Sequence, residues 1–339
     1  MNGKPVFTVE AKSIINTKSG FAKKLLCDGF TFSMGDACAY SCSFCYVESM
    51  FAKLPRVMEL KAAHKLTHND MVIRRGGALE ILKKELIHPS GKRKWFGTEQ
   101  AGRVIYSSPA VDVAANMDLV RETIEACALI LRYTDWHIRL LSKSNLLPKV
   151  ADGLVGLARH EAGEIFTETD VHQRVIFGVS TGTLDDGVAA AFEEKTANVS
   201  ARIRSLHWLQ DKGFRTFGMI CPSLPLPDSV AYFRFAAAAA EAIRVEKCEH
   251  VWAEVINVRG DSMVNTCDAL SRAGFFQLSE LVKTVSSNEA LWEEYNRATF
   301  LAHAKALAAH PGKLRFLTYT KKGTHDWWKE RQNLGAVLL

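Results

Sequence analysis

The sequence predicts an α/β protein built as a partial (β/α)6 TIM-like barrel, followed by a mostly helical C-terminal extension. Short apolar runs alternate with stretches of helical spacing from about residue 29 to residue 260, and this alternation is typical of a parallel sheet. The chain has 339 residues, a normal length for one barrel. Hydrophobic residues make up 47% of it, which is enough for a large core.

The strands and helices are expected in the following order. Residues 29–34 (GFTFSM) predict a first strand, which runs into a Gly-Asp turn and a group of cysteines. Asn116 is expected to cap a helix whose apolar face includes Met117 and Leu131. Further strands are expected at 104–107, 137–142, 175–180, 216–221, 250–255 and 314–319, and further helices at 50–66, 69–86, 145–158, 198–213 and 229–243.

Two domains are expected from this order. Residues 1–278 would form the barrel, with a cysteine loop at 35–48, and residues 279–339 would form an extension packed on it. In barrels of this kind the chemistry lies at the carboxyl ends of the strands. Because the cysteines follow the first strand, we expect them at that end of the barrel.

The overall charge and the N-terminus limit the classes of function. Lys and Arg outnumber Asp and Glu by 43 to 37, a formal charge of +6, which permits an anionic partner such as DNA or RNA without requiring one. The first residues contain no apolar core of a secretory signal, and the longest apolar run is too short to cross a bilayer. A cytoplasmic protein without a membrane partner is therefore expected, and its oligomeric state is left open.

Three of the eight cysteines lie within eight residues, at Cys38, Cys42 and Cys45. The other five are scattered, which does not resemble a disulfide framework in a long chain of cytoplasmic type. Spacings of three and two residues allow one short loop to place three thiolates around one cluster. Iron–sulfur clusters are usually held by four cysteines, so three ligands leave one iron open. The loop therefore predicts a [4Fe–4S] cluster with an open position.

A structural zinc loop is the alternative for these cysteines. Zinc sites normally show paired Cys-x-x-Cys knuckles or a nearby histidine. This segment has a single Cys-x-x-Cys, one extra cysteine and no second knuckle. Gly35, Asp36 and Ser41 indicate a loop rather than a chance grouping of core cysteines. The spacing therefore favours the iron–sulfur cluster.

The cysteine motif, with Tyr46 directly after its third cysteine, resembles the radical SAM superfamily. Later motifs follow the order found in the spore photoproduct lyase-like branch, a DNA repair photolyase-like group, over roughly residues 28–260. The matching segments are Ser142-Lys143-Ser144, Ser180 with Leu184-Asp185, Glu194 with Arg202, Gly213, Pro222 with Pro225, and Glu254–Gly260.

This resemblance implies a barrel of the radical SAM type and an enzyme that uses S-adenosylmethionine (SAM). The open iron would bind SAM, and reduction by a flavodoxin or ferredoxin type of partner would yield a 5′-deoxyadenosyl radical. Cys38, Cys42 and Cys45 would hold the metal, and Tyr46 would also be catalytic. The residues implied in SAM binding are Tyr46, Ser107, Ser108, Ser142, Lys143, Ser180, Glu194 and Arg202.

Two departures count against lyase activity itself. The lyases carry a hydrogen-donating cysteine at the end of the second strand, where this chain has Ser107 and Ser108. They also carry a tyrosine before the third cluster cysteine, where this chain has Phe44. Cys221, at the end of the fifth expected strand, is a candidate catalytic thiol, although a buried structural thiol is the commoner fate.

The substrate is the main open choice. The resemblance favours a lyase or transferase type of enzyme that modifies or repairs a nucleobase or nucleic acid, but a peptide or a metabolite also fits a partial barrel. A non-catalytic, metal-stabilised protein that binds nucleic acid is the alternative from another class. It would bind through the basic residues between Lys53 and Lys94, or by stacking of bases on Trp327 and Trp328. The basic residues can equally form a solvated helix face, and the two tryptophans can equally belong to a tail packed on the barrel.

Overall fold

The computed structural model describes residues 3–51, 53–107, 109–160 and 166–339. They form two compact units. The first unit comprises Met1–Ser41, Val47–Gly178 and Trp208–Arg215. The second comprises Cys42–Tyr46, Val179–His207 and Thr216–Leu339. The cysteine loop therefore contributes Cys38 to the first unit and Cys42 and Cys45 to the second.

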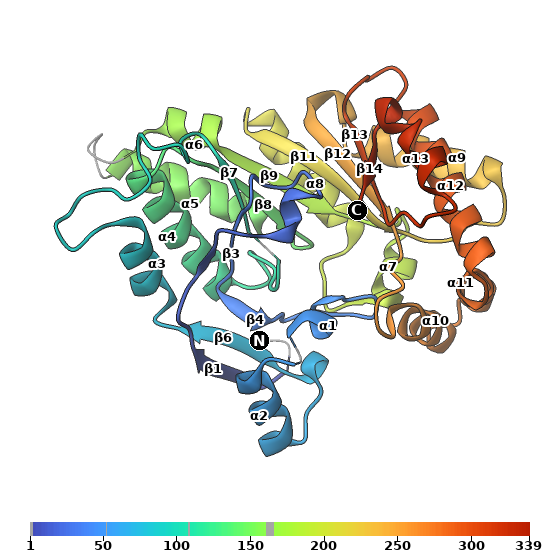
Figure 1. Ribbon diagram of the computed structural model, residues 1–339, viewed down its shortest axis with the longest axis horizontal. Coiled ribbons are helices and arrows are strands. Elements are labelled where there is room, and N and C mark those ends of the chain that lie inside the picture. The colour runs from blue at the N-terminus through green and yellow to red at the C-terminus, as the bar shows by residue number, and fades with distance from the viewer. Residues whose placement is uncertain (1–2, 52, 108, 161–165) are drawn as a thin grey trace. The chain divides into compact units, whose positions relative to one another are not determined.

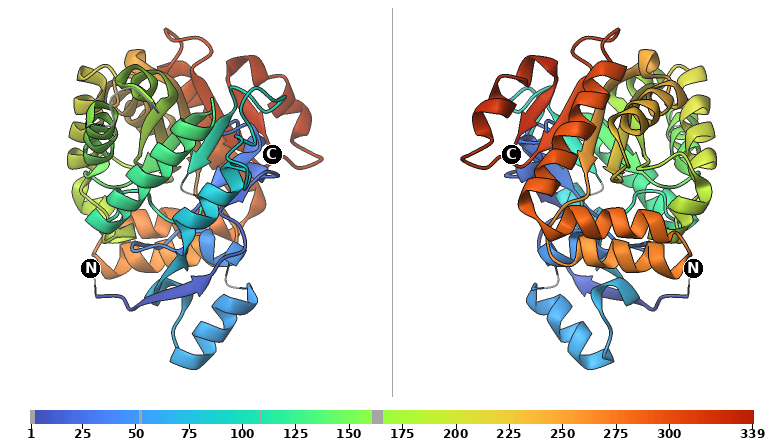
Figure 2. Two further views of the ribbon diagram at one scale, coloured as in Figure 1. Left: turned by 90° about the vertical axis from the view of Figure 1, so that its left-hand side faces the viewer. Right: turned by 90° about the vertical axis from the view of Figure 1, so that its right-hand side faces the viewer.

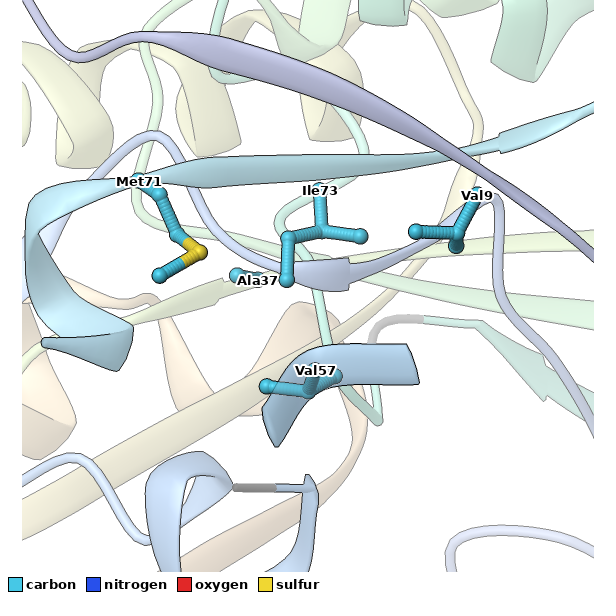
Figure 3. Close-up of a cluster of buried hydrophobic side chains, with 5 residues drawn as sticks. All are labelled: Val9, Ala37, Val57, Met71 and Ile73. Atoms are coloured by element: carbon cyan, nitrogen blue, oxygen red, sulfur yellow. The ribbon is translucent and has the colours of Figure 1, made fainter. Parts of the chain in front are cut away.

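A three-stranded sheet in the first unit carries the strand that leads to the cysteines. Its order is β1 (Val6–Glu10), β6 (Val72–Gly76) and β4 (Gly35–Ala37), with β1 parallel and β4 antiparallel to β6. Figure 3 shows the small hydrophobic core beside this sheet. In it, Val57 of α2 (Pro55–His64) packs with one side chain from each of the three strands and with Met71, which directly precedes β6. The core residues are Val9, Ala37, Val57, Met71 and Ile73.

The expected helix at 69–86 is wrong over its first half, where the chain forms strand β6 of this sheet. A short 3-10 turn, His68–Asp70, precedes β6, and only Ala78–Leu86 is helical, as α3. The expected helix at 50–66 is likewise two elements, α1 (Val47–Phe51) and α2. Pro55 fits this break because proline is favoured in the first turn of a new helix.

A mainly parallel sheet forms the rest of the first unit. In it β2 (Ile15–Asn16) is antiparallel to β3 (Phe30–Phe32), and β3, β7 (Val104–Ser107) and β8 (His137–Ser142) are parallel. Asn116 caps α4 (Met117–Tyr133) as expected, because its side chain accepts a hydrogen bond from the Leu119 N–H. The remaining elements are the 3-10 turn Gly20–Ala22, α5 (Leu147–His160), α6 (Glu168–Arg174) and β9 (Val175–Ser180).

The second unit is built on a parallel sheet in the order β11 (Arg215–Ser223), β12 (Cys248–Val255), β13 (Leu314–Thr318) and β14 (Ala336–Leu338). The end of β9 joins β11, since the Thr181 N–H donates to the Met219 carbonyl. Figure 1 labels these strands, and Figure 2 shows α10 (Ser262–Arg272) beside α11 (Phe276–Ser287). A two-stranded sheet joins β5 (Ser41–Cys42) and β10 (Glu193–Glu194). The other elements are α7 (Asp186–Phe192), α8 (Val199–Asp211), α9 (Ser229–Ala242), the 3-10 turns Val245–Lys247 and Gln332–Leu334, α12 (Glu289–Ala306) and α13 (His325–Lys329).

The predicted α/β class with a parallel sheet is confirmed by these strand pairs. The expected boundary at residue 278 lies within α11, and residues on both sides of it belong to the second unit. Trp328 is fully buried, and Trp327 lies beneath the guanidinium of Arg331, 3.9 Å from ring centroid to Cζ. This pair therefore packs within the unit, as the packed-tail interpretation expects.

His303 of α12 predicts a loss of stability in acid. The side chain is fully buried, and neither ring nitrogen has a hydrogen-bond partner among the residues that the structure describes. Burial lowers the pKa of His303 from 6.5 to about 4. The unfolded chain therefore binds a proton at His303 more readily than the folded protein does. For this reason the free energy of unfolding is highest above pH 6.5, as far as His303 is concerned, and falls as the pH drops towards 4.

The expected loss is about 3 kcal/mol over this range, at 1.36 kcal/mol for each pKa unit. Urea unfolding of the wild type and of His303→Leu at several pH values measures it. As the pH falls, the free energy of unfolding should decrease less in the variant than in the wild type. A constant difference between the two proteins at every pH would contradict the assignment.

Candidate functional site

The backbone of the first half of the cysteine loop is held by a buried lysine, Lys4. Lys4 is 9% exposed, and its ammonium donates to the carbonyl oxygens of Tyr40, at 2.6 Å, and Cys38, at 3.4 Å. Charge-assisted hydrogen bonds of this kind are stronger than neutral ones. They fix the path of the backbone that carries Cys38.

Asp36, two residues before Cys38, is a fully buried carboxylate held by two arginines. Arg75 donates to one oxygen through Nη2 at 2.7 Å and Nε at 3.0 Å, and Arg56 donates to the other at 2.7 Å. The ring of His68 is 3.0 Å from the Asp36 carbonyl oxygen. A buried charge is tolerated only when it is paired in this way, so the approach to Cys38 has one defined conformation.

Asp112, after β7, connects Cys38 to the end of β8. Its carboxylate accepts hydrogen bonds from the hydroxyl of Ser142 and the backbone N–H of Lys143, both at 2.7 Å. Its own backbone N–H donates to the sulfur of Cys38 at 3.4 Å. The structure therefore brings together three of the residues predicted from sequence, through an aspartate that sequence reasoning missed.

The second half of the cysteine loop is anchored on the end of α7. Ser43 donates to the carbonyl oxygen of Phe192 through both its backbone N–H, at 2.9 Å, and its hydroxyl, at 3.1 Å. The rings of Phe44 and Phe192 are in contact, with centroids 5.4 Å apart. The Cys45 N–H donates to the Cys42 carbonyl at 3.1 Å, which tightens the turn between these two cysteines.

Arg202 holds the chain that follows Phe192. Its side chain is fully buried and forms an ion pair with the equally buried Glu193 at 2.6 Å. It also donates to the Ser180 carbonyl at 2.9 Å, and its remaining bonds go to Ala197 and Thr196. Glu194, the carboxylate predicted from sequence, is exposed, so the partner of Arg202 in the structure is its neighbour Glu193. Roles of Glu194 and Arg202 in SAM binding stay predictions.

Ser180 and Cys221 lie together at the end of β11. The Ser180 hydroxyl donates to the Cys221 carbonyl at 3.0 Å, and the Cys221 thiol donates to the Glu254 carboxylate at 3.8 Å. Cys221 is partly exposed, whereas Glu254 is buried. Because the strands are parallel, both side chains lie near the carboxyl edge of the sheet, where chemistry is located in folds of this type.

The remaining predicted residues are placed as follows. Ser107 is buried at the end of β7, Tyr46 is partly exposed just before α1, and Ser108 lies outside the described residues. Several of the basic side chains after Lys53 are paired within the first unit. The pairs are Arg56 and Arg75 with Asp36, Lys61 with Glu48, and Arg74 with Glu122.

The cysteines have the chemistry of a metal-binding set. Cys38, Cys42 and Cys45 are thiols outside any disulfide and are partly exposed, and the sulfur of Cys38 accepts a hydrogen bond from an N–H. Such hydrogen bonds to sulfur are a feature of iron–sulfur sites. Within the described ranges, no three His, Cys, Asp or Glu side chains are grouped as metal ligands. Three thiols within one short loop are nevertheless the donor type that iron–sulfur clusters use.

The fold resembles spore photoproduct lyase, a radical SAM enzyme. A cysteine-to-serine variant of that lyase matches with a TM-score of 0.52 and 11% identity, over 79% of this chain and 66% of the lyase chain. A variant with a dinucleoside spore photoproduct matches with a TM-score of 0.53 and 11% identity, over 80% and 67%. A third, with bound AdoMet and the same dinucleoside, matches with a TM-score of 0.52 and 12% identity, over 80% and 67%.

This likeness supports the predicted α/β fold, with a parallel sheet that resembles the partial barrel of the lyase. The chain spans about two thirds of the length of the lyase chains it matches. No family model and no curated protein sequence matches it. In the described part of the chain, none of the helices combines the length and the apolar character that crossing a membrane requires.

Proposed function

We propose that this chain is a radical SAM enzyme that cleaves SAM reductively and acts on a nucleobase or nucleic acid. The observation that carries the proposal is the Cys38-x3-Cys42-x2-Cys45 loop on a fold that resembles spore photoproduct lyase. A bound [4Fe–4S] cluster would supply the electron that divides SAM into methionine and a 5′-deoxyadenosyl radical. The protein's part is to hold the cluster, orient SAM and exclude water.

The three cysteines would hold the cluster, and the strand ends would orient SAM. Ser142 and Lys143 come from the end of β8, and Ser180 from the end of β9. Each of these residues lies at the carboxyl end of its own strand, the position that carries the chemistry in barrels of this type. The full set proposed for SAM is Tyr46, Ser107, Ser108, Ser142, Lys143, Ser180, Glu194 and Arg202.

The substrate class rests on the likeness to the lyase, whose structures hold a dinucleoside spore photoproduct. A non-catalytic zinc-stabilised protein remains the second candidate, because the cysteine thiols suit zinc as well. Anaerobic reconstitution, with analysis of iron, sulfide and zinc, separates the two. Brown protein with equal iron and sulfide supports the enzyme, whereas colourless protein with zinc contradicts it.

This chain is expected not to repair the spore thymine dimer with catalytic SAM. A lyase must return a hydrogen atom to the product radical, and a thiol suits this because its S–H bond is weak. Ser107, at the end of β7, has a stronger O–H bond and cannot replace it. SAM should therefore be consumed as a co-substrate. Anaerobic incubation with dimer-containing DNA, followed by mass spectrometry of the released thymines, measures repair.

Cys221 is the thiol that can reverse this expectation. Efficient repair with catalytic SAM that is lost in Cys221→Ala would contradict the prediction and make Cys221 the hydrogen donor. The matched control is Cys248→Ala. Cys248 is a buried residue of β12 whose thiol donates a hydrogen bond to the Ile243 carbonyl.

A further inference from the structure

The loop after β7 is tied to two other parts of the first unit through Asp112. Asp112 is 8% exposed, and three donors surround its carboxylate. The Ser142 hydroxyl and the Lys143 N–H come from the end of β8, and the Ala114 N–H, at 2.9 Å, comes from its own loop. A buried carboxylate with three donors has one preferred orientation.

This orientation directs the backbone of Asp112 at the first cysteine. Its N–H donates to the Cys38 sulfur at 3.4 Å, within the range of hydrogen bonds to sulfur. On the other side, Lys4 holds the carbonyls of Cys38 and Tyr40, so the thiol lies on a backbone fixed by its own contacts. The backbone on each side of this N–H···S contact is therefore held by the protein's own residues.

We infer that Asp112 is a positioning residue that sets the reduction potential of the cluster bound by Cys38. An N–H donor stabilises negative charge on a ligand sulfur, and the stabilisation is greater when the cluster is reduced. Hydrogen bonds to the sulfurs are one of the features that set iron–sulfur potentials. This inference rests on the proposed cluster and concerns its potential, not the identity of the substrate.

The test is an anaerobic redox titration of the reconstituted full-length protein, followed by EPR. Asp112→Glu keeps the negative charge but moves the carboxylate by one methylene, so the N–H is no longer held at the sulfur. The reduction equilibrium should fall about tenfold, a shift of 59 mV to more negative potential for one electron. Ser142→Ala removes one of the three donors without changing charge, and should shift the potential in the same direction by less.

The control is Asp118→Glu, an exposed carboxylate paired with Arg121 on α4, which should leave the potential unchanged. Wild-type potentials in Asp112→Glu and in Ser142→Ala would overturn the inference. If Asp112→Glu does not retain the cluster, Ser142→Ala alone decides by the same criterion. A wild-type protein that assembles no cluster would instead contradict the proposed function, so the two failures are distinguishable.

Discussion

Arg202→Ala is expected to lower the free energy of unfolding by about 3–5 kcal/mol. The substitution leaves Glu193 as a fully buried carboxylate without its cation. It also removes the hydrogen bonds that Arg202 donates to the Ser180 carbonyl and the Thr196 hydroxyl oxygen. Leaving one charge of a buried pair unpaired costs much more than the pair itself contributes. Urea unfolding of the wild type and the variant measures the loss.

Arg159→Ala is the matched control on the surface. Arg159 pairs with Glu168 at 2.7 Å, but both side chains are largely exposed. Solvent screens an exposed pair, so this variant should unfold almost as the wild type does. Arg202→Ala with wild-type stability and weakened SAM binding would contradict the structural role and support the role implied by the resemblance.

Replacing any one of Cys38, Cys42 and Cys45 by alanine is expected to remove the cluster and SAM cleavage together. Each thiolate is one of only three protein ligands in the proposed site. Neither neighbouring anchor, Lys4 on the Cys38 carbonyl nor Phe192 on Ser43, supplies a replacement sulfur. Iron and sulfide analysis of each reconstituted variant gives the result.

The remaining thiols provide the controls for this prediction. Burial raises the pKa of Cys27 and of Cys127, which keeps both thiols protonated and unsuited to metal. Alanine at Cys27, Cys127, Cys248 or Cys267 should leave the iron content unchanged. Wild-type cluster content in all three loop variants would remove the assignment.

The parallel strands could be predicted from sequence because each is a short apolar run with its own turn signals. β7, β8 and β9 begin and end at the residues expected. β6 was missed because its partner, β1, lies more than sixty residues away in sequence. Helical spacing over 69–86 does not reveal such a partner, and β6 forms because pairing with β1 outweighs local preference.

The candidate site was predictable to the extent that it is local in sequence. Cys38, Cys42 and Cys45 form a compact motif, whereas Asp112 is one acidic residue in a loop and has no sequence signal. Glu194 was predicted as a SAM-binding carboxylate, whereas the glutamate that pairs with Arg202 in the structure is the adjacent Glu193. Spacing alone does not decide which of two adjacent glutamates faces the interior, because that depends on packing around α7 and β10.

The most direct measurement of the central claim is the yield of 5′-deoxyadenosine from SAM. Reconstituted wild-type protein is incubated anaerobically with SAM and dithionite, and the products are followed by mass spectrometry. The proposal predicts 5′-deoxyadenosine and methionine from the wild type, and neither product from Cys42→Ala. A wild-type protein that carries a full complement of iron and sulfide but yields no 5′-deoxyadenosine would contradict it.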